Sequence, residues 1–89
     1  MKITVELYGA SRDFSSESFI EINLPNNSKI KDLRKELIKF IDNHHAGNEN
    51  FRELVKAAAF CSDKNEIIHD DYVISKEQKI AIIPPIGGG

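Results

Sequence analysis

The chain has 89 residues, of which 40% are hydrophobic and 29% charged, so its length and composition are those of one small globular domain. Its formal net charge is −2, which argues against a nucleic-acid binder, because such proteins carry a basic face or stripe. The single cysteine excludes an internal disulfide bond. The N-terminus has no signal-like apolar region, and no apolar run approaches the length of a membrane helix, about 18 residues. We therefore expect a soluble cytoplasmic protein that binds neither nucleic acid nor membrane.

The first part of the chain predicts two strands. Residues 2–8 and 18–24 each alternate apolar with polar side chains, which is typical of half-buried strands. The apolar members of the two stretches are Ile3, Val5, Leu7, Ile20, Ile22 and Leu24. Residues 9–13 between them predict a turn region, and Pro25 ends the second stretch. We expect an antiparallel hairpin with a connection longer than the tight two-residue kind.

The residues after Pro25 predict an amphipathic helix. Ser28 is the expected N-cap, within one residue, because its hydroxyl can accept a hydrogen bond from the first turn. From residue 29 to about 43 the apolar residues repeat at helical spacing, and the charged residues take the opposite face. The apolar positions are Ile30, Leu33, Leu37, Phe40 and Ile41. This helix should lie across the hairpin with its charged face in solvent.

The second half of the chain predicts a short helix and three strands. Residues 51–55 have the pattern of a short helix, and the apolar run that follows predicts a strand over residues 56–62. Residues 66–68 predict a short strand after a turn, and residues 79–83 predict a last strand. Because this last run is almost continuously apolar, we expect a central strand that is covered on both faces. The expected fold class is therefore α+β, with one sheet and one main helix packed across it.

Three polar features of this half invite a chemical interpretation, and each has a simpler explanation. His44 and His45 are adjacent, so their side chains point apart, and no cysteine or carboxylate pair stands at a metal-ligand spacing from them. Asp70 and Asp71 are neighbours in a polar loop, where aspartates usually serve turns. Cys61 lies in a predicted strand and is expected to be a small buried residue. We therefore expect no metal site and no catalytic side chain here.

The end of the sequence is unusual, because the last strand runs into Pro84 and Pro85, then Ile86, then three glycines. Proline has a fixed φ and no N–H, so the pair should end the strand and direct the chain outward in an extended path. The glycines at 87–89 lack a Cβ and pass where any side chain would clash. Residues 86–89 reach at most about 14 Å beyond the prolines. The pattern predicts a narrow probe on a rigid mount, suited to a channel in another protein.

We expect the α-carboxylate of Gly89 to be the reacting group. A free α-carboxyl has a reference pKa of about 3.3–3.7, so it is ionised near neutral pH, and no side chain hinders it here. A partner that binds ATP could convert it to an acyl-adenylate, which a sulfur or nitrogen nucleophile would then attack. The simpler alternative is an idle glycine-rich tail or the remainder of an expression tag. The position of the glycines, directly after a strand and two prolines, favours a functional tail.

These features together resemble the small, sulfur-carrying subunit of molybdopterin synthase, that is, the MoaD-like proteins of the ubiquitin-like (β-grasp) class. Residues 83–89 resemble the ending of that family, which is an apolar residue, Pro-Pro, an aliphatic residue, a small residue and Gly-Gly. Residues 7–13 resemble its first strand and turn. The chain departs from the family at Gly87, where Ala or Ser is usual, and at residues 75–78, where a Gly-Asp pair is usual. Residues 44–55 match no part of the family pattern.

The resemblance implies a fold and a division of labour. The fold would be a β-grasp of the order ββαβββ with a short extra helix, in which residues 1–85 form the domain and residues 86–89 a functional tail. An E1-like adenylyltransferase would activate the Gly89 carboxylate with ATP, and a sulfur donor protein would convert it to a thiocarboxylate. The large subunit of molybdopterin synthase would receive the tail, and the sulfur would pass to a pyranopterin precursor. This chain would bind no cofactor and would supply no catalytic side chain of its own.

The resemblance also implies roles for the residues near the end of the chain. Gly87 and Gly88 would thread into the partner ahead of the reacting carboxylate. The sheet face near the tail would dock on the partner. Individual partner contacts would come from Pro84, Pro85, Ile86 and Arg12. For the arginine, an ordinary surface position is an equally good explanation.

Three alternatives stay open. A sulfur carrier for thiamine-thiazole synthesis or for tRNA thiolation shares the fold and the Gly-Gly end, although thiazole carriers are usually shorter and lack the two prolines. A ubiquitin-like protein modifier would use the same carboxylate to form an isopeptide bond with a lysine. A non-covalent interaction domain would carry an idle tail. The Pro84-Pro85 pair and the chain length favour the molybdopterin role.

Overall fold

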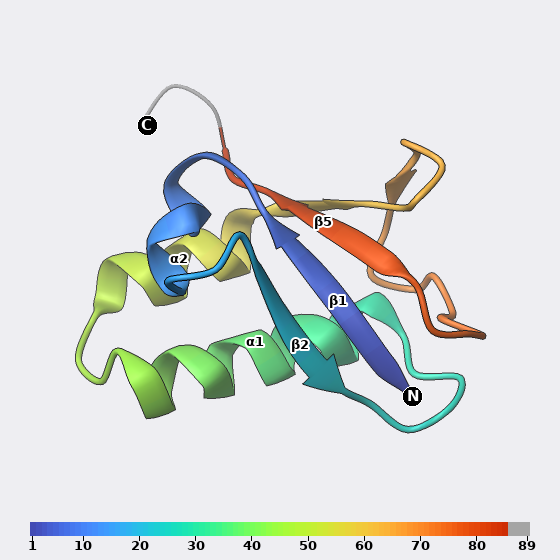
Figure 1. Cartoon of the computed structure of the whole chain (residues 1–89), viewed down its shortest axis with the longest axis horizontal. Helices are drawn as coiled ribbons and strands as arrows, with labels where there is room; N and C mark the ends of the chain where they lie inside the picture. The colour runs from blue at the N-terminus through green and yellow to red at the C-terminus, as the bar shows by residue number, and fades with distance from the viewer. Residues whose placement is uncertain (86–89) are drawn as a thin grey trace.

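The computed structural model describes residues 1–85 and has a five-stranded mixed sheet with α1 and α2 on one of its faces (Figure 1). Across the sheet the strand order is β2-β1-β5-β3-β4. The elements are β1 (Lys2–Leu7), the 3-10 helix η1 (Gly9–Phe14), β2 (Phe19–Asn23), α1 (Ile30–His44), α2 (Glu49–Ala57), β3 (Ala59–Cys61), β4 (Ile67–Ile68) and β5 (Lys79–Ile83). This confirms the α+β order expected from the sequence and adds η1. Over these 85 residues, no helix combines the length and the apolar character needed to cross a membrane.

The pairing of the strands places the last strand in the middle of the sheet. β1 and β2 form the expected antiparallel hairpin, with Val5 opposite Ile20. β5 lies parallel to β1 on one side and antiparallel to β3 on the other. Because β1 and β5 are parallel, their C-terminal ends meet at the same edge of the sheet (Figure 1). At this edge β1 leads into η1, and β5 leads into Pro84.

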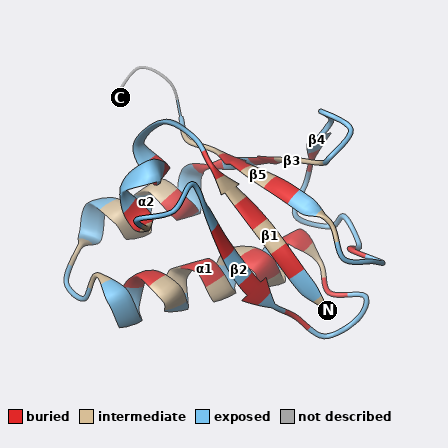
Figure 2. Cartoon of the chain, viewed as in Figure 1, coloured by how far each residue is buried: buried red, intermediate tan, exposed pale blue. Residues whose placement is uncertain are grey.

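The core lies between the sheet and the helices. Buried and more exposed residues alternate along β1, β2 and β5, so one face of the sheet packs against α1 and α2 (Figure 2). The residues with no exposed surface in this core are Ile3, Val5, Ile30, Leu33, Leu37, Ile41, Val55, Phe60, Ile74, Ile80 and Ile82. They come from both layers, and burial of their apolar surface, at about 25 cal/mol per Å², is the main force that holds the layers together.

β5 has the predicted bounds and the predicted central position, but only one of its faces is buried. Ile80 and Ile82 have no exposed surface, whereas Ala81 and Ile83 are half-buried. The prediction of a strand covered on both faces was therefore wrong. The reason is that both helices pack on the same side of the sheet, so Ala81 and Ile83 lie on the opposite side. We call that side, the one without helices, the open face.

The region between β1 and β2 is more ordered than the predicted turn. Residues 9–14 form the 3-10 helix η1, which begins at Gly9 with a left-handed φ of +58°. Phe14, at the end of η1, is 1% exposed and joins the core. The buried ring therefore ties the connection to the domain, which the turn-like residues 9–13 alone could not indicate.

The N-terminus of α1 lies within one residue of its predicted position, but the predicted capping bond is wrong. The helix begins at Ile30, and Lys29 is the residue before it. The Ser28 hydroxyl donates to the carbonyl of Pro25 (2.7 Å) instead of accepting from the first turn. The Asp32 carboxylate takes that place in part, since it accepts from the Lys29 N–H at 2.8 Å. A local acidic residue thus caps the helix where a hydroxyl was expected.

The boundary between α2 and β3 also differs from the prediction. The predicted short helix over residues 51–55 is confirmed but extends to Ala57, so the predicted strand over 56–62 is reduced to β3. The Asn48 side chain caps α2, because its oxygen accepts from the Phe51 N–H at 3.0 Å. Of the three alanines that follow, only Ala57 is helical: Ala58 is the extended C-cap residue, and Ala59 begins β3.

Candidate functional site

The candidate site is the edge of the sheet at which β1 and β5 end. β5 pairs with β1 from Lys79 to Ile82 and with β3 from Ala81 to Ile83, so only β3 holds its last residue. Pro84 follows directly and is half-buried, whereas Pro85 is exposed. Proline lacks the N–H that a ladder needs, so the strand stops at Ile83, as predicted. The chain therefore leaves the sheet from a firmly held central strand.

η1 lies beside the start of this exit. A Cβ built on Gly9 would lie 3.6 Å from Cγ and 3.8 Å from Cδ of Pro84, so the first residue of η1 lies beside the proline ring, and one added carbon would bring the two into van der Waals contact. The turn is closed by Ser11, whose hydroxyl donates to the Tyr8 carbonyl (2.6 Å) and accepts from the Tyr8 N–H (2.9 Å). Ser11 has no exposed surface. A turn that is closed by a buried serine thus lies beside the point where the chain leaves β5.

The structure places three of the predicted site residues. Pro84 and Pro85 lie at the end of β5, and Arg12 is exposed on η1, the turn that lies beside Pro84. These three residues therefore lie at one edge of the sheet, and their role as partner contacts stays a prediction. The remaining predicted site residues lie outside the described residues, and their roles stay predictions. They are Ile86, Gly87, Gly88 and Gly89.

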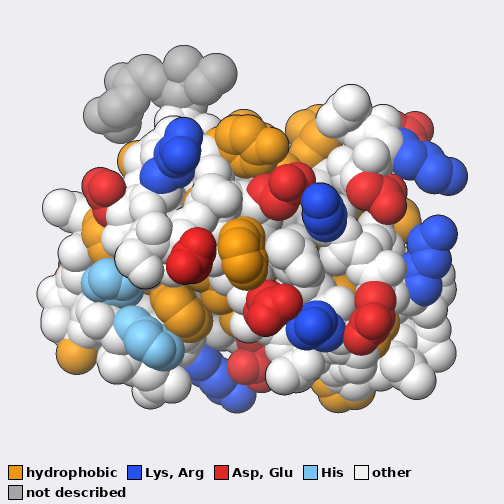
Figure 3. Space-filling model, viewed as in Figure 1, with side chains coloured by type: hydrophobic (Ala, Val, Ile, Leu, Met, Phe, Trp, Pro, Cys, Tyr) orange, Lys and Arg blue, Asp and Glu red, His pale blue; other side chains and the backbone are white. Residues whose placement is uncertain are grey.

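The open face carries a shallow groove of about 350 Å³ next to this edge. Its apolar lining comes from Tyr8, Ala81, Ile83 and Cys61, and Tyr8 is 48% exposed. In Figure 3, hydrophobic side chains lie at the upper margin of the molecule and also in the middle of the view, where acidic and basic side chains surround them. The sequence predicted docking by the sheet face near the tail but did not identify these four residues. In the sequence they could be recognised only as the positions that alternate with the buried residues of each strand. The parallel pairing of β1 with β5 then brings them together.

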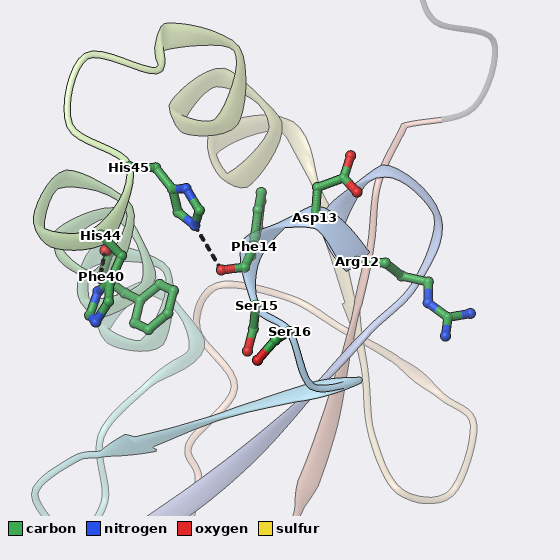
Figure 4. Close-up of a pocket in the computed structure, with 8 residues that line it drawn as sticks. All are labelled: Arg12, Asp13, Phe14, Ser15, Ser16, Phe40, His44 and His45. Atoms are coloured by element: carbon green, nitrogen blue, oxygen red, sulfur yellow. Dashed lines mark hydrogen bonds between the residues drawn. The ribbon is translucent and has the colours of Figure 1, made fainter.

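A second hollow, of about 680 Å³, lies between η1 and the junction of α1 with α2 (Figure 4). His45 and His44 line it, and each ring bonds to the backbone: Nε2 of His45 lies 2.8 Å from the Phe14 carbonyl, and Nδ1 of His44 lies 3.0 Å from the Phe40 carbonyl. A carbonyl only accepts, so each of these nitrogens carries the proton. Arg12 points away from the two histidines (Figure 4).

The bonds of these histidines are structural. Within residues 1–85, no group of three or more His, Cys, Asp and Glu side chains is placed to hold a metal ion. The His45 ring also packs edge-on against Phe51, with 5.0 Å between the ring centroids. Residues 44–55, which matched no family pattern, therefore serve at least to hold η1 against the helices.

The other polar candidates have structural surroundings as well. Asp70 accepts a 2.8 Å hydrogen bond from Arg34, which gives its carboxylate a role in packing. Asp71 is exposed in the loop between β4 and β5. Cys61 is half-buried on the open face, so the prediction that it is a small buried residue was wrong. β3 is the neighbour of β5 on the side away from β1, and no helix covers the open face of this part of the sheet.

Comparison with known proteins supports the fold and leaves the family open. The sequence matches no protein-family model, and a search of curated proteins finds no significant match. Solved structures do match: SAMP1 from Haloferax volcanii aligns at a TM-score of 0.69 with 15% sequence identity, over 100% of both chains. A candidate molybdopterin converting factor, subunit 1, from Pyrococcus furiosus aligns at a TM-score of 0.69 with 18% identity, over 96% of this chain and 98% of that one.

A ubiquitin from Caldiarchaeum subterraneum aligns at a TM-score of 0.61 with 15% identity, over 100% of this chain and 98% of that one. At such low identities, the likeness shows the fold alone. It agrees with the mixed sheet, the parallel pairing of the first and last strands and the helix across one face. The chain therefore has the β-grasp fold of ubiquitin-like proteins.

Proposed function

We propose that this chain is a sulfur carrier, the small subunit of a molybdopterin synthase, and that the Gly89 carboxylate carries the sulfur. The observation that carries the proposal is the exit of the chain: a central strand fixed on both sides ends at a proline pair and continues into a glycine-rich end. The structural likeness to a candidate molybdopterin converting factor, subunit 1, is compatible with this role, and the Pro84-Pro85 pair favours it over the other carriers. In this proposal, residues 1–85 are the domain that partners recognise, and residues 86–89 are the working tail.

The chemistry needs only the terminal carboxylate and partners. In the active site of an E1-like adenylyltransferase, a carboxylate oxygen of Gly89 attacks the α-phosphorus of ATP, and pyrophosphate leaves. Hydrosulfide then attacks the acyl carbonyl and AMP leaves, which gives the thiocarboxylate. If the donor is a protein persulfide, the product is an acyl disulfide, and a thiol must attack the donor's sulfur to release the thiocarboxylate and leave a disulfide on the donor. On the large subunit of molybdopterin synthase, the sulfur passes to a pyranopterin precursor and water restores the carboxylate. Catalytic side chains and the ATP site belong to the partners in this scheme.

Intact-mass spectrometry tests this function directly. The purified chain is incubated with the E1-like adenylyltransferase of the same cell, ATP and sodium sulfide. We expect the mass gain that replacing one oxygen by sulfur produces, and fragmentation should place it on Gly89. The same measurement on protein from the source cells would show whether Gly89 is its last residue there. Absence of the mass gain, with an adenylyltransferase that is active on its known carrier, would refute the proposal.

The groove on the open face is the proposed docking surface, and exchange of Tyr8 tests it. Tyr8→Glu places a charge among Ala81, Ile83 and Cys61, where a partner would have to desolvate it. We expect binding to the activating enzyme to weaken by about 30-fold or more, as for an interface hot spot. Tyr72→Glu is the matched control, because Tyr72 is similarly exposed (40%) but lies in the loop between β4 and β5. Calorimetric titration measures the affinity of both variants for the activating enzyme. Equal affinities would exclude the groove as the docking surface.

A protein modifier is the second candidate function, because the fold is shared with a ubiquitin. It would use the same acyl-adenylate, but the nucleophile that ends the pathway would be a lysine amine. An epitope-tagged chain in its source cells then gives covalent conjugates that resist boiling in detergent. A carrier for thiazole synthesis or tRNA thiolation would form the thiocarboxylate but no dithiolene with a molybdopterin-synthase large subunit and precursor. The two assays separate the three roles.

A further inference from the structure

Gly9, in the first turn of the chain, lies beside Pro84, where the last strand ends. A Cβ on Gly9 would meet two atoms of the proline ring, at 3.6 and 3.8 Å, and would have no other neighbour within 4 Å among residues 1–85 apart from those next to it in the chain. Gly9 has a φ of +58°, a conformation that non-glycine residues rarely adopt. A Cβ at this position would therefore make an ordinary van der Waals contact with the ring, and a larger side chain is expected to crowd it.

η1 is held rigidly on the side away from Pro84. Ser11 makes two hydrogen bonds to the backbone of Tyr8 and has no exposed surface. Phe14 is 1% exposed and lies against Phe51, with 5.0 Å between the ring centroids. His45 donates from Nε2 to the Phe14 carbonyl at 2.8 Å (Figure 4). The turn that lies beside Pro84 is thus fastened to itself and to the junction of the helices, so it resists displacement.

We propose that η1 is a positioning device for the tail, with Gly9 as the positioning residue. By fixing Pro84, it sets the place and direction from which residues 86–89 start toward a partner's active site. This inference rests on the proposed function of the Gly89 carboxylate. A reacting group misplaced by about 1 Å can lose about a hundredfold in rate, so displacement of the exit affects the chemistry even when docking is intact.

Substitution of Gly9 separates positioning from docking. Gly9→Val adds two γ-methyl groups beyond a Cβ that already lies in contact with Pro84, and because the β-branched side chain is stiff, we expect it to displace the proline ring. Gly9→Ala adds only a Cβ at an ordinary contact distance of 3.6 Å. Gly47→Val and Gly47→Ala are the matched controls, because Gly47 also has a positive φ (+84°) but, among the residues that the structure describes, none beyond its chain neighbours lies within 4 Å of its Cβ position. The controls carry the backbone strain without the contact.

The experiment combines steady-state kinetics of ATP-dependent adenylation by the E1-like enzyme with NMR of the Pro84 resonances. For Gly9→Val we expect kcat to fall about tenfold with KM unchanged, because the docking groove is intact. Gly9→Ala should lose less than about threefold, in line with its smaller contact. Pro84 resonances should shift in Gly9→Val and not in Gly47→Val, and the Gly47 variants should keep the kcat of the parent chain.

Several outcomes would overturn the proposal. If Pro84 resonances shift in Gly9→Val while kcat stays at the parent value, the exit position does not matter. If Gly47→Val loses as much kcat, the effect comes from strain rather than from the contact. Should Gly9→Val fail to fold, Gly9→Ala is compared with Gly47→Ala instead. Equal kcat values for these two variants, with shifted Pro84 resonances in Gly9→Ala, would contradict positioning. An unmodified chain that is not adenylated at all refutes the proposed function, and the positioning role falls with it.

Discussion

A chain that carries one alanine after Gly89 is expected to be neither adenylated nor converted to a thiocarboxylate. The added residue turns the Gly89 carboxyl into an amide, which is not an oxygen nucleophile toward ATP. The new carboxylate lies about 3.5 Å further along the chain and has a methyl group beside it, so it overshoots a narrow active site. We expect a loss of at least about a thousandfold in rate, since both the position and the access of the reacting group change. Intact-mass spectrometry and pyrophosphate release measure it.

The control inserts the same alanine after Ser75, in the exposed loop between β4 and β5. Ser75 and Lys76 are both exposed, and loops of this kind tolerate insertion. This control adds the same mass and leaves Gly89 last, and it should be adenylated at the parent rate. Both variants should melt at the temperature of the parent chain. Normal adenylation of the chain extended after Gly89, with the extra alanine still present by mass, would disprove the role of that carboxylate.

The bounds of some elements could be predicted because the sequence contains the local cause. β5 begins and ends where expected, since a β-branched run meets Pro84. The boundary after α2 could not be predicted, because the run from Ala57 to Cys61 is apolar at every position and has no period. In the structure, Arg34 binds the carbonyls of Val55 and Ala58, which lie 21 and 24 residues away. No local pattern contains such a contact, so the end of the helix is set by tertiary structure.

The candidate site divides in the same way. The proline pair and the glycines are visible in the sequence because their effect on the backbone is local. The position of η1 beside Pro84 is not visible in the sequence, because Gly9 and Pro84 come from opposite ends of the chain. Alternation of apolar residues shows which face of a strand is buried, but it does not name the strand's neighbour. The groove around Tyr8 and Ile83 exists because β1 pairs with β5, which only the resemblance to a known fold could anticipate.

Arg34 is expected to be the most important polar residue for stability. Nη1 donates to the carbonyls of Val55 and Ala58, at 2.8 and 2.7 Å, and so binds the last turn of α2 and the start of β3. Its guanidinium lies 4.9 Å from the centre of the Phe60 ring, and Nη2 donates to Asp70 at 2.8 Å. The Arg34 side chain is only 19% exposed, so water can replace few of these contacts.

Arg34→Ala is expected to lower the free energy of unfolding by about 3 kcal/mol, because each hydrogen bond from a charged donor contributes about 1.5–3 kcal/mol and the carbonyls lose their partner. The cation–π contact with Phe60 adds about 0.5–2 kcal/mol. The Asp70 pair contributes little, since that carboxylate is 53% exposed. Domains of this kind have a total stability of only about 5–15 kcal/mol, so the loss is a large fraction.

Urea unfolding of three variants separates the geometry of Arg34 from its charge. Arg34→Lys keeps the positive charge but cannot reach two carbonyls and a carboxylate with one planar fork, so we expect most of the loss to persist. Arg52→Ala is the matched control, because Arg52 pairs with Asp42 and Glu49 near the surface and is 34% exposed. Its removal should cost less than about 1 kcal/mol. If Arg34→Ala were no more destabilised than Arg52→Ala, the junction of α2 and β3 would have to be held by burial of Val55 and Phe60 alone, and the arginine would be dispensable.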